Sequence, residues 1–290
     1  MSDISVLGLG NMGSALAGAL LESGRSVTVW NRSAGKAQPL VERGAHLADS
    51  AQEAIAASPA TVTCLKNHEA TTETLRPLAA QLSGKAILDL STGGAEEAED
   101  LVEMLNGAGA GWLIGMINAY PAGVGKAETS ILCASPPQVW EAHCGAIRAM
   151  GGASAHVATM AAAIPALFAS LFTARQGFMF GLIYGGAVCR KAGLPMEALV
   201  AQIPVTLGVA EKYAETFANT VPDQSYDNPG APVSVYLAAL DDVMATFEAT
   251  GTADEFPRLM RDITRRAVDA GLSEKELTAL VDMLAGTAGR

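Results

Sequence analysis

A glycine-rich turn near the N-terminus has the residue types and spacing that bind a dinucleotide. Gly8-Leu9-Gly10-Asn11-Met12-Gly13 fits the pattern G-x-G-x-x-G and stands between an apolar run and an amphipathic segment. In that setting the first glycine allows a tight turn, the second lets a pyrophosphate approach the backbone, and the third lets helix pack on strand. The helix N-terminus adds N–H donors and the positive end of a dipole. We therefore expect these six residues to bind the diphosphate of a dinucleotide.

The residues at the end of the second predicted strand indicate which dinucleotide is bound. Enzymes that use NAD offer an acidic side chain to the ribose 2′-hydroxyl at this point, but this chain has Asn31, followed by Arg32, Ser33 and Lys36. An uncharged amide does not repel a 2′-phosphate, and the next three polar side chains can bind one through charge-assisted hydrogen bonds. The pattern favours NADP over NAD, the alternative being a basic surface turn without a ligand.

Two further predicted strands end in residues that belong at the same edge of the sheet. The first is followed by Cys64, Leu65 and Lys66, and the second by the turn 90–94 with Thr92. Open α/β sheets bind ligands at the carboxyl ends of their strands, so we expect these residues to contact the cofactor. Thr92 could also hydrogen-bond a substrate nitrogen. The alternative role for Thr92 is that of a turn or capping residue before the acidic segment 96–100.

Other catalytic schemes find little support. The sequence contains no G-x-S-x-G, Walker A or H-E-x-x-H pattern. The four histidines, His46, His68, His143 and His156, are neither paired nor at the spacing of metal ligands, so we expect no metal site. The four cysteines stand too far apart for C-x-x-C pairs, which indicates a reducing, cytoplasmic setting.

The composition excludes several classes of partner. The chain has 290 residues with 19 Lys+Arg, 30 Asp+Glu and a net charge of −11, so nucleic-acid binding is not expected. Half of the residues are hydrophobic, and the stretch 157–174 lacks charged side chains. Pro165, Ser170 and the many alanines in that stretch favour a buried core helix over a membrane span, and the N-terminus lacks a basic signal region. A small molecule or another protein is the expected partner.

The pattern of elements predicts an α/β domain followed by an all-α region. Short β-branched runs alternate with amphipathic stretches over the first half of the chain, which is typical of βαβ units and a mostly parallel sheet. The runs that we predict as strands are 4–10, 26–30, 60–65, 86–91, 113–117 and 153–157. The rest reads as helical, beginning with a long helix from about 165 to 192. We expect a dinucleotide-binding domain over 1–160, an interdomain helix over 161–192 and a helical dimerisation and substrate domain over 193–290.

Several motifs together resemble the NADPH-dependent imine reductases and reductive aminases of the β-hydroxyacid dehydrogenase superfamily. They are GLGNMG (8–13), WNRS with Lys36, DLSTGG (89–94), LIGMINAYPAGVG (113–125), GLIYGGAVCRKAGLP (181–195) and SYDNPGAPVSVYLAALDD (225–242). The resemblance implies a Rossmann domain of the 6-phosphogluconate dehydrogenase type, a long interdomain helix and a helical domain exchanged between two subunits. It implies an active site between one subunit's cofactor domain and its partner's helical domain.

The resemblance also shows a departure on the long helix. β-Hydroxyacid dehydrogenases carry a proton-shuttling lysine there, but this chain has no lysine between Lys126 and Lys191. Imine reductases generally carry an aspartate or tyrosine at the position that corresponds to Phe168, and some reductive aminases carry a tyrosine at the position of Gln176. The usual acid is therefore missing from its usual place.

The remaining candidates for the substrate site follow from helical spacing and from the sheet edge. Phe168, Phe172, Arg175, Gln176 and Met179 share one helix face. The Arg-Gln pair lines a substrate cleft, extends to solvent or makes a dimer contact. Tyr120, Tyr184 and Tyr236 are the remaining hydroxyl donors, each of which could instead be a packing residue. The expected catalytic set is Thr92, Tyr120 and Gln176, and the expected substrate contacts are Met116, Asn118, Phe168, Phe172, Arg175, Gln176, Met179 and Tyr236.

The sequence thus predicts a homodimeric reductase that transfers hydride from NADPH to the C=N bond of an imine or iminium ion. An iminium ion needs no acid for hydride transfer, so cleft shape and an apolar wall would suffice. Two alternatives remain: a carbonyl or conjugated C=C reductase on the same scaffold, and a non-catalytic NADP-binding protein.

Overall fold

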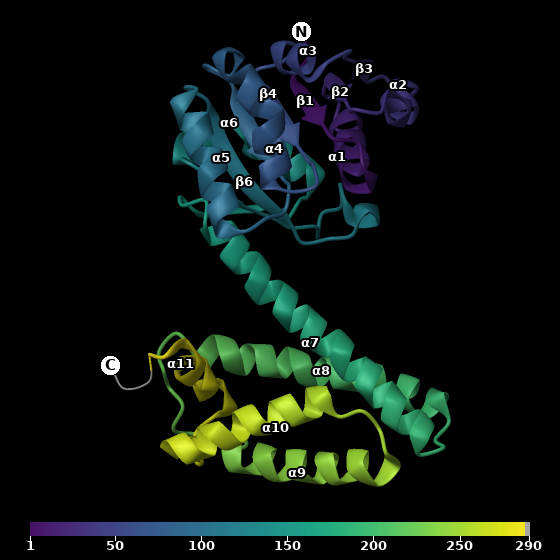
Figure 1. Ribbon diagram of the computed structural model, residues 1–290, viewed down its shortest axis with the longest axis vertical. Helices are drawn as coiled ribbons and strands as arrows, with labels where there is room; N and C mark the ends of the chain where they lie inside the picture. The colour runs from purple at the N-terminus through teal and green to yellow at the C-terminus, as the bar shows by residue number, and fades with distance from the viewer. Residues whose placement is uncertain (288–290) are drawn as a thin grey trace. The chain divides into compact units, whose positions relative to one another are not determined.

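The chain forms two compact units in the computed structural model, which describes residues 1–287 without the side chain of Ala34. The units divide between Phe172 and Thr173, and helix α7 (Ala163–Lys191) begins in the first and ends in the second (Figure 1). The three segments expected from the sequence, 1–160, 161–192 and 193–290, remain a prediction about domains.

The first unit is built on one eight-stranded sheet with the strand order β3-β2-β1-β4-β5-β6-β7-β8. All neighbouring strands are parallel except β6 and β7, which are antiparallel. The predicted α/β class with a mostly parallel sheet is confirmed. The strands are β1 (Ile4–Leu7), β2 (Val27–Trp30), β3 (His46–Leu47), β4 (Ala60–Thr63), β5 (Ala86–Asp89), β6 (Gly111–Ile117), β7 (Ile131–Ala134) and β8 (Ala155–Ala158).

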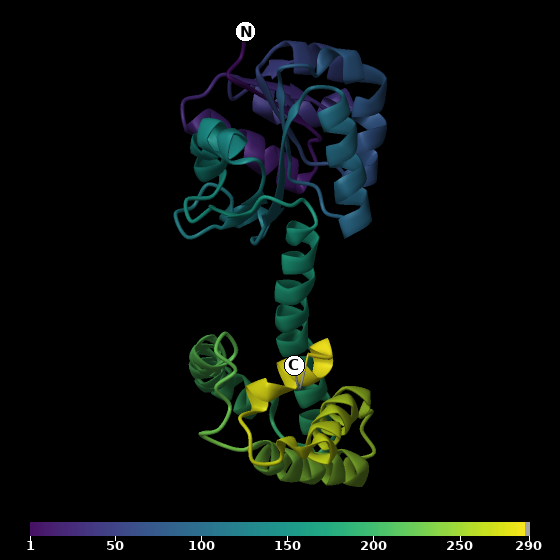
Figure 2. The ribbon, with the colours of Figure 1, turned by 90° about the vertical axis from the view of Figure 1, so that its left-hand side faces the viewer.

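Helices cover both faces of this sheet, because successive side chains of a strand point to opposite faces. In β1, for example, Ile4 and Val6 join one buried cluster and Leu7 joins the other. Helices α1 (Asn11–Glu22) and α6 (Pro137–Met150) contribute to the first cluster. Helices α3 (Ala51–Ala56), α4 (His68–Leu75) and α5 (Ala95–Gly107) contribute to the second (Figure 2). The remaining short segments of this unit are η1 (Ala34–Ala37), α2 (Gln38–Val41), η2 (Arg76–Gln81) and η3 (Pro121–Gly123).

The strand order reverses at β1, and this reversal sets the place of a ligand site. From β1 the chain proceeds outward to β2 and β3 on one side, then returns to β4 on the other side of β1. The connections that leave β1 and β4 therefore run to opposite faces of the sheet, which opens a crevice at their carboxyl ends. The glycine-rich turn after β1 and residues 64–66 after β4 lie at this crevice.

The sheet has two strands that sequence patterning did not predict. β3 has only two residues, which is too short for a pattern to show. β7 pairs antiparallel to β6, and this pairing depends on residues that are distant in the sequence. Strand β8 was expected at 153–157 and spans Ala155–Ala158. Helix α7 begins before Pro165, which lies in its first turn, where a proline costs no intrahelical hydrogen bond.

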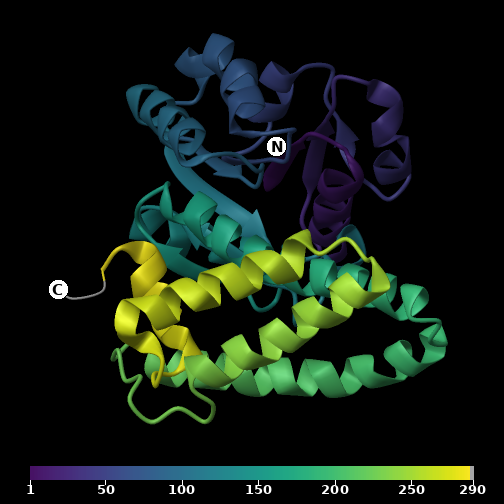
Figure 3. The same cartoon turned by 60° about the horizontal axis from the view of Figure 1, so that its bottom comes forward.

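The second unit is all-helical, as predicted. Helices α9 and α10 run side by side (Figure 3), and the buried residues of α9 are Val233, Leu237, Met244 and Phe247. Helix α10 ends at Ala267, where a π-helical turn (Val268–Leu272) follows, and Gly271 adopts a positive φ of 85°. The elements beyond α7 are α8 (Met196–Thr220), α9 (Val233–Thr250), α10 (Glu255–Ala267), η4 (Val268–Leu272), η5 (Leu277–Ala279) and α11 (Leu280–Ala285).

Helix α7 is unusually apolar for its low burial. Within residues 1–287 it is the one helix with the length and hydropathy to cross a membrane, with a mean hydropathy of 1.3. Core helices of soluble proteins pass the same test, so this is weak evidence for a span. Ile164 is the buried residue of α7 in the single chain.

Candidate functional site

The glycine-rich turn joins β1 to α1 and has room for a ligand at one glycine only. Gly8 has a φ of 96°, and a Cβ there would lie 2.4 Å from the Cys64 carbonyl oxygen. A Cβ on Gly13 would lie 1.9 Å from the Gly8 carbonyl oxygen. A Cβ on Gly10 would meet nothing within 4 Å, and Gly10 is the N-cap residue just before α1, where no side chain caps the helix. Two glycines therefore serve close packing, and the third leaves open space beside the free N–H groups of the helix, as a pyrophosphate requires.

Asn31 connects the end of β2 to this turn. Its Oδ1 accepts a hydrogen bond from the Leu9 backbone N–H at 2.9 Å, and its Nδ2 donates to the Ser33 carbonyl oxygen at 3.1 Å. Both polar atoms of the amide thus hold backbone in place. An aspartate could accept from Leu9 but could not donate to Ser33, because a carboxylate has no N–H.

A cavity of about 280 Å³ follows Asn31, at the end where the adenosine half of a dinucleotide would lie. Three cations, Arg32, Lys36 and Lys66, and one anion, Glu73, line it, so its formal charge is 3 − 1 = +2. The three cationic side chains are exposed and can reach a ligand. The cavity is lined by Trp30, Asn31, Arg32, Ser33, Lys36, Leu65, Lys66, Ala70, Glu73 and Thr74. A phosphate on the ribose fits these residues.

Cys64 has a structural position behind the turn. Burial, together with the negative charge of Asp89, raises the pKa of its thiol to about 12. A thiol with this pKa stays protonated and is a poor nucleophile at neutral pH. All four cysteines are free thiols.

A buried polar network lies at the carboxyl end of β5. Asp89, the last residue of that strand, is fully buried, and its Oδ2 lies 2.6 Å from Nδ1 of His68, the first residue of α4. Three hydroxyl groups surround the other oxygen, Oδ1: those of Thr63 at 2.7 Å, Ser91 at 2.7 Å and Thr71 at 3.1 Å. A buried carboxylate with this many donors has the partners that its charge needs.

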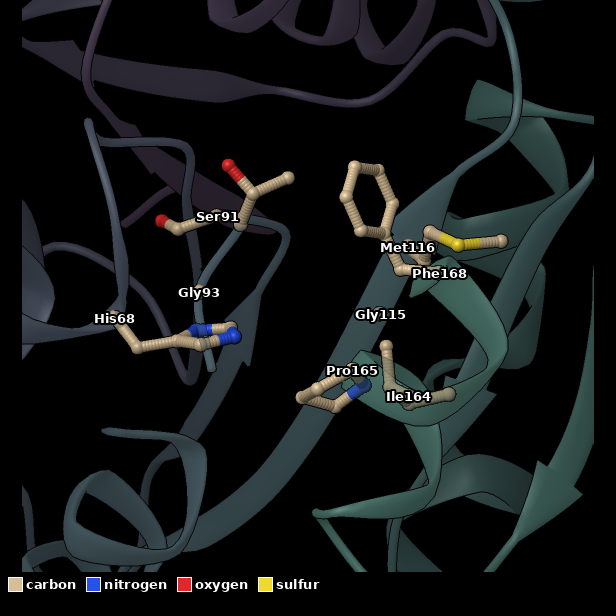
Figure 4. Close-up of a pocket in the computed structure, with 9 residues that line it drawn as sticks. His68, Ser91, Gly93, Gly115, Met116, Ile164, Pro165 and Phe168 are labelled. Carbon is tan, nitrogen blue, oxygen red and sulfur yellow. The ribbon is translucent and has the colours of Figure 1, made fainter. Parts of the chain in front are cut away.

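A small cavity separates this network from the start of α7 (Figure 4). His68 and Gly93 lie on one side, and Ile164, Pro165 and Phe168 of α7 lie on the opposite side. Thr92 also lines the cavity. Gly115 and Met116 of β6, with Ser91, complete the lining. Its volume of about 10 Å³ is close to the least that holds one water molecule.

The structure brings some of the predicted catalytic and substrate residues together around this cavity. Thr92, Met116 and Phe168 line it, and Phe172 stacks on Phe168 with ring centroids 5.2 Å apart. Tyr120 is 71% exposed at the start of η3, and Asn118 is exposed just after β6, so neither side chain lines the cavity.

The other predicted residues lie in the second unit. Arg175, Gln176 and Met179 belong to the part of α7 that follows Phe172. Tyr184 donates its hydroxyl to Glu255 at 3.0 Å, and this hydrogen bond raises the pKa of Tyr184. Tyr236 lines an apolar cavity of about 530 Å³ between α8, α9 and α10. Their roles at the substrate remain predictions.

Sequence reasoning missed the pairing of His68 with Asp89, because it looked for histidines close to other histidines or at metal-ligand spacing. A signal was available. His68 follows β4, Asp89 ends β5, and these parallel strands are neighbours, so their carboxyl ends meet at one edge. Among residues 1–287 no group of His, Cys, Asp and Glu side chains could hold a metal ion.

The matches to known proteins along the chain all point to one family of enzymes. Residues 3–161 match the family model of the NAD binding domain of 6-phosphogluconate dehydrogenase, and residues 166–286 match the C-terminal domain of NADPH-dependent reductive aminase-like proteins. An NADPH-dependent reductive aminase from Aspergillus oryzae is 26% identical over 286 residues, which cover 96% of each chain.

Solved structures agree with this match. An imine reductase from Myxococcus stipitatus in complex with NADP+ superposes with a TM-score of 0.91 at 28% identity, over 97% of this chain and 99% of that one. A reductive aminase from Aspergillus terreus in complex with NADPH4, cyclohexanone and allyl amine superposes with a TM-score of 0.87 at 28% identity, over 98% and 99% of the two chains. Together with the family models, these likenesses show that the chain belongs to the imine reductase and reductive aminase family. Its cofactor domain is of the 6-phosphogluconate dehydrogenase type.

Proposed function

We propose that this enzyme reduces the C=N bond of imines or iminium ions with NADPH, in an active site whose long helix carries Phe168 in place of the usual acid. The observation that carries the proposal is the shape and charge of the predicted cofactor site. It combines an open Gly10 at the start of α1 with a cavity of charge +2 at the end of β2. The family to which the chain belongs supplies the reaction class.

Different residues of the first unit would bind different parts of the cofactor. The turn from Gly8 to Gly13 would bind the diphosphate, and Arg32, Ser33 and Lys36 would bind the 2′-phosphate. Leu65 and Lys66, which line the same cavity, would contact the adenosine half, and Cys64 after β4 and Thr92 after β5 would contact other parts of the cofactor. Bound NADPH supplies the hydride, and the protein supplies position and surroundings.

Phe168 makes the site apolar where relatives of this family carry a proton donor. Its ring lies across the small cavity from Gly93 (Figure 4). It also stacks on the ring of Phe172. Such a wall holds a flat, apolar substrate near the cofactor, which contributes through orientation. A cation that arrives as a preformed iminium ion needs no acid before it accepts hydride. We propose that Gln176, Met179 and Tyr236 add to substrate binding, and that Tyr120, whose side chain is exposed in the single chain, is a further candidate for the chemistry.

We propose further that the enzyme works as a homodimer in a reducing, cytoplasmic setting. Helices α7 and α8 present large apolar side chains to solvent in the single chain: Phe180 is 48%, Ile183 62%, Val205 62% and Val209 64% exposed. Large apolar side chains exposed in this number indicate a surface that another protein covers. A second copy of the chain fits, because oligomers of identical chains bury such surfaces against each other. Light scattering on the purified protein should therefore give twice the mass of one chain.

A substrate panel tests the proposed reaction. NADPH oxidation should exceed background with cyclic iminium and imine substrates, and the amine product should appear in equal amount. Turnover of ketones or enones alone would instead assign the enzyme to carbonyl or C=C reduction. Tight NADPH binding without turnover of any panel member, and without gain on Phe168→Asp, would indicate a non-catalytic NADP-binding protein. A loss of NADPH no faster with any imine than without one would refute the proposal.

A further inference from the structure

The absence of an acid at Phe168 raises the question of how a neutral imine would gain its proton, and the pair of His68 and Asp89 offers a source. Oδ1 of Asp89 faces the hydroxyl groups of Thr63, Thr71 and Ser91, and a carboxylate can only accept hydrogen bonds. Nδ1 of His68, at 2.6 Å from Oδ2, must then carry a proton. This fixes the tautomer and leaves Nε2 as the ring atom that exchanges protons.

The ring of His68 is held so that Nε2 faces the small cavity. It lies under the turn after β5, where a Cβ on Gly93 would be 2.5 Å from the ring carbon Cδ2. The imidazole points into the cavity toward Pro165 (Figure 4). Nε2 has no hydrogen-bond partner among the residues that the structure describes, and it is not among the fully buried atoms. Its free edge therefore opens on the space between the turn and α7.

Two carboxyl groups lie close to the ring of His68. Asp89 of β5 contacts the ring directly. Glu97 of α5 has a buried Oε2 without a hydrogen bond among the described residues, and it lies on the same side of Gly93 as the ring: a Cβ on Gly93 would be 2.6 Å from this oxygen and 2.5 Å from Cδ2 of His68. The cavity walls from β6 and α7 contribute apolar side chains, those of Met116, Ile164 and Phe168. The N-terminal end of α4 opposes a positive charge on His68, and the charge-assisted hydrogen bond to Asp89 offsets this effect.

We propose that His68 supplies the proton to the substrate nitrogen through one water molecule in the cavity, and that Asp89 is its positioning residue. The inference rests on the proposed imine reduction. A proton leaves Nε2 of the imidazolium for the water, and the water passes a proton to the imine nitrogen, which becomes an iminium ion. Hydride from NADPH then adds to the iminium carbon, the π electrons settle on nitrogen, and amine and NADP+ result. Solvent returns the proton to His68, so one NADPH and one proton are used for each C=N bond.

The test compares two substrates that differ only in their need for a proton. A neutral cyclic imine needs one before hydride transfer, and its N-methylated iminium salt does not. In His68→Gln we expect kcat for the imine to fall by about 10²-fold to 10⁴-fold, the usual contribution of general acid catalysis, with the iminium rate unchanged. The exposed His46 gives a matched control, and His46→Gln should alter neither rate. Adding Phe168→Asp to His68→Gln should restore part of the imine rate.

Each result decides the matter. Equal losses on both substrates would show that His68 only braces the turn, and an unchanged imine rate would show that it takes no part; either overturns the proposal. If His68→Gln does not bind NADPH, Asp89→Asn replaces it, and the same selective loss is expected because the tautomer is no longer fixed. Failure of both variants to bind NADPH would make the pair a folding element only and would also overturn the proposal. If the unmodified enzyme reduces neither substrate, the proposed function itself has failed.

Discussion

The charge of the cavity after β2 gives a direct test of cofactor choice. Arg32→Ala combined with Lys36→Ala changes the formal charge of the lining from 3 − 1 = +2 to 1 − 1 = 0, because only Lys66 and Glu73 remain. The backbone contacts of Asn31 to Leu9 and Ser33 are untouched by these changes. The variant should therefore keep the turn and lose only the contacts to the 2′-phosphate.

The size of the loss follows from the exposure of the two cations. An exposed pair of charges about 4 Å apart is worth about 1 kcal/mol in water. A well-formed hydrogen bond to a charged group is worth about 1.5–3 kcal/mol. Because both side chains are exposed, each contributes about 1–2 kcal/mol, between the screened charge pair and the lower part of the hydrogen-bond range. The two together contribute roughly 2–4 kcal/mol, which is about a 30-fold to 700-fold rise in the Kd for NADPH. The Kd for NADH should stay the same, since NADH lacks the phosphate.

Binding titrations with NADPH and NADH at two salt concentrations measure this difference. Added salt should weaken NADPH binding to the unmodified protein and have little effect on the variant, because the screened interaction is gone. Lys126 and Arg266, which are exposed, give a control pair that removes the same total charge elsewhere. If both dinucleotides lose affinity equally, the cavity does not bind the 2′-phosphate and the reasoning is wrong.

Three further predictions concern the turn, the dimer and alkaline stability. Gly13→Ala forces a Cβ to 1.9 Å from a carbonyl oxygen and should destabilise the fold by about 1–3 kcal/mol. Gly10→Ala should leave the melting temperature unchanged and abolish NADPH binding, because its methyl group fills the open space. Ile183→Arg, at a position 62% exposed in the single chain, should shift the mass in light scattering from two chains to one, and a persistent dimer would contradict the proposed interface. The thiols of Cys64 and Cys133 have pKa values raised by burial to about 12 from 9.0, so the unfolded chain loses its protons first as pH rises. The free energy of unfolding, measured with urea, should be unchanged below pH 9. It should fall by up to about 1.4 kcal/mol per pH unit and per thiol between pH 9 and 12, and it should fall less steeply in Cys133→Ala.

Much of the first unit could be predicted because its signals are local. The turn from Gly8 to Gly13 must follow a strand and open a helix to function, so six residues fixed the first βα unit and the place of the crevice. Short runs of β-branched residues predicted most of the parallel strands. β7 carries no such signal, because its place depends on antiparallel pairing with β6, and pairing across a loop is not encoded in periodicity.

The candidate site was predicted less completely, since it depends on which strand ends are neighbours. Thr92, Met116 and Phe168 were named separately, and their shared cavity depends on α7 beginning beside the turn after β5. His68 was set aside because its partner is 21 positions away in the sequence. Only the sheet order, with β4 next to β5, brings the two side chains together.

The low burial of α7 has a consequence for how the protein should be handled. Among residues 1–287, this helix of 29 residues buries only Ile164, so it gains little from packing in an isolated copy. If a second copy covers it, the free energy of folding contains an association term, and the folded fraction then depends on protein concentration. Dilution would act on such a protein as a mild denaturant, and melting temperatures measured at nanomolar and micromolar concentrations would differ.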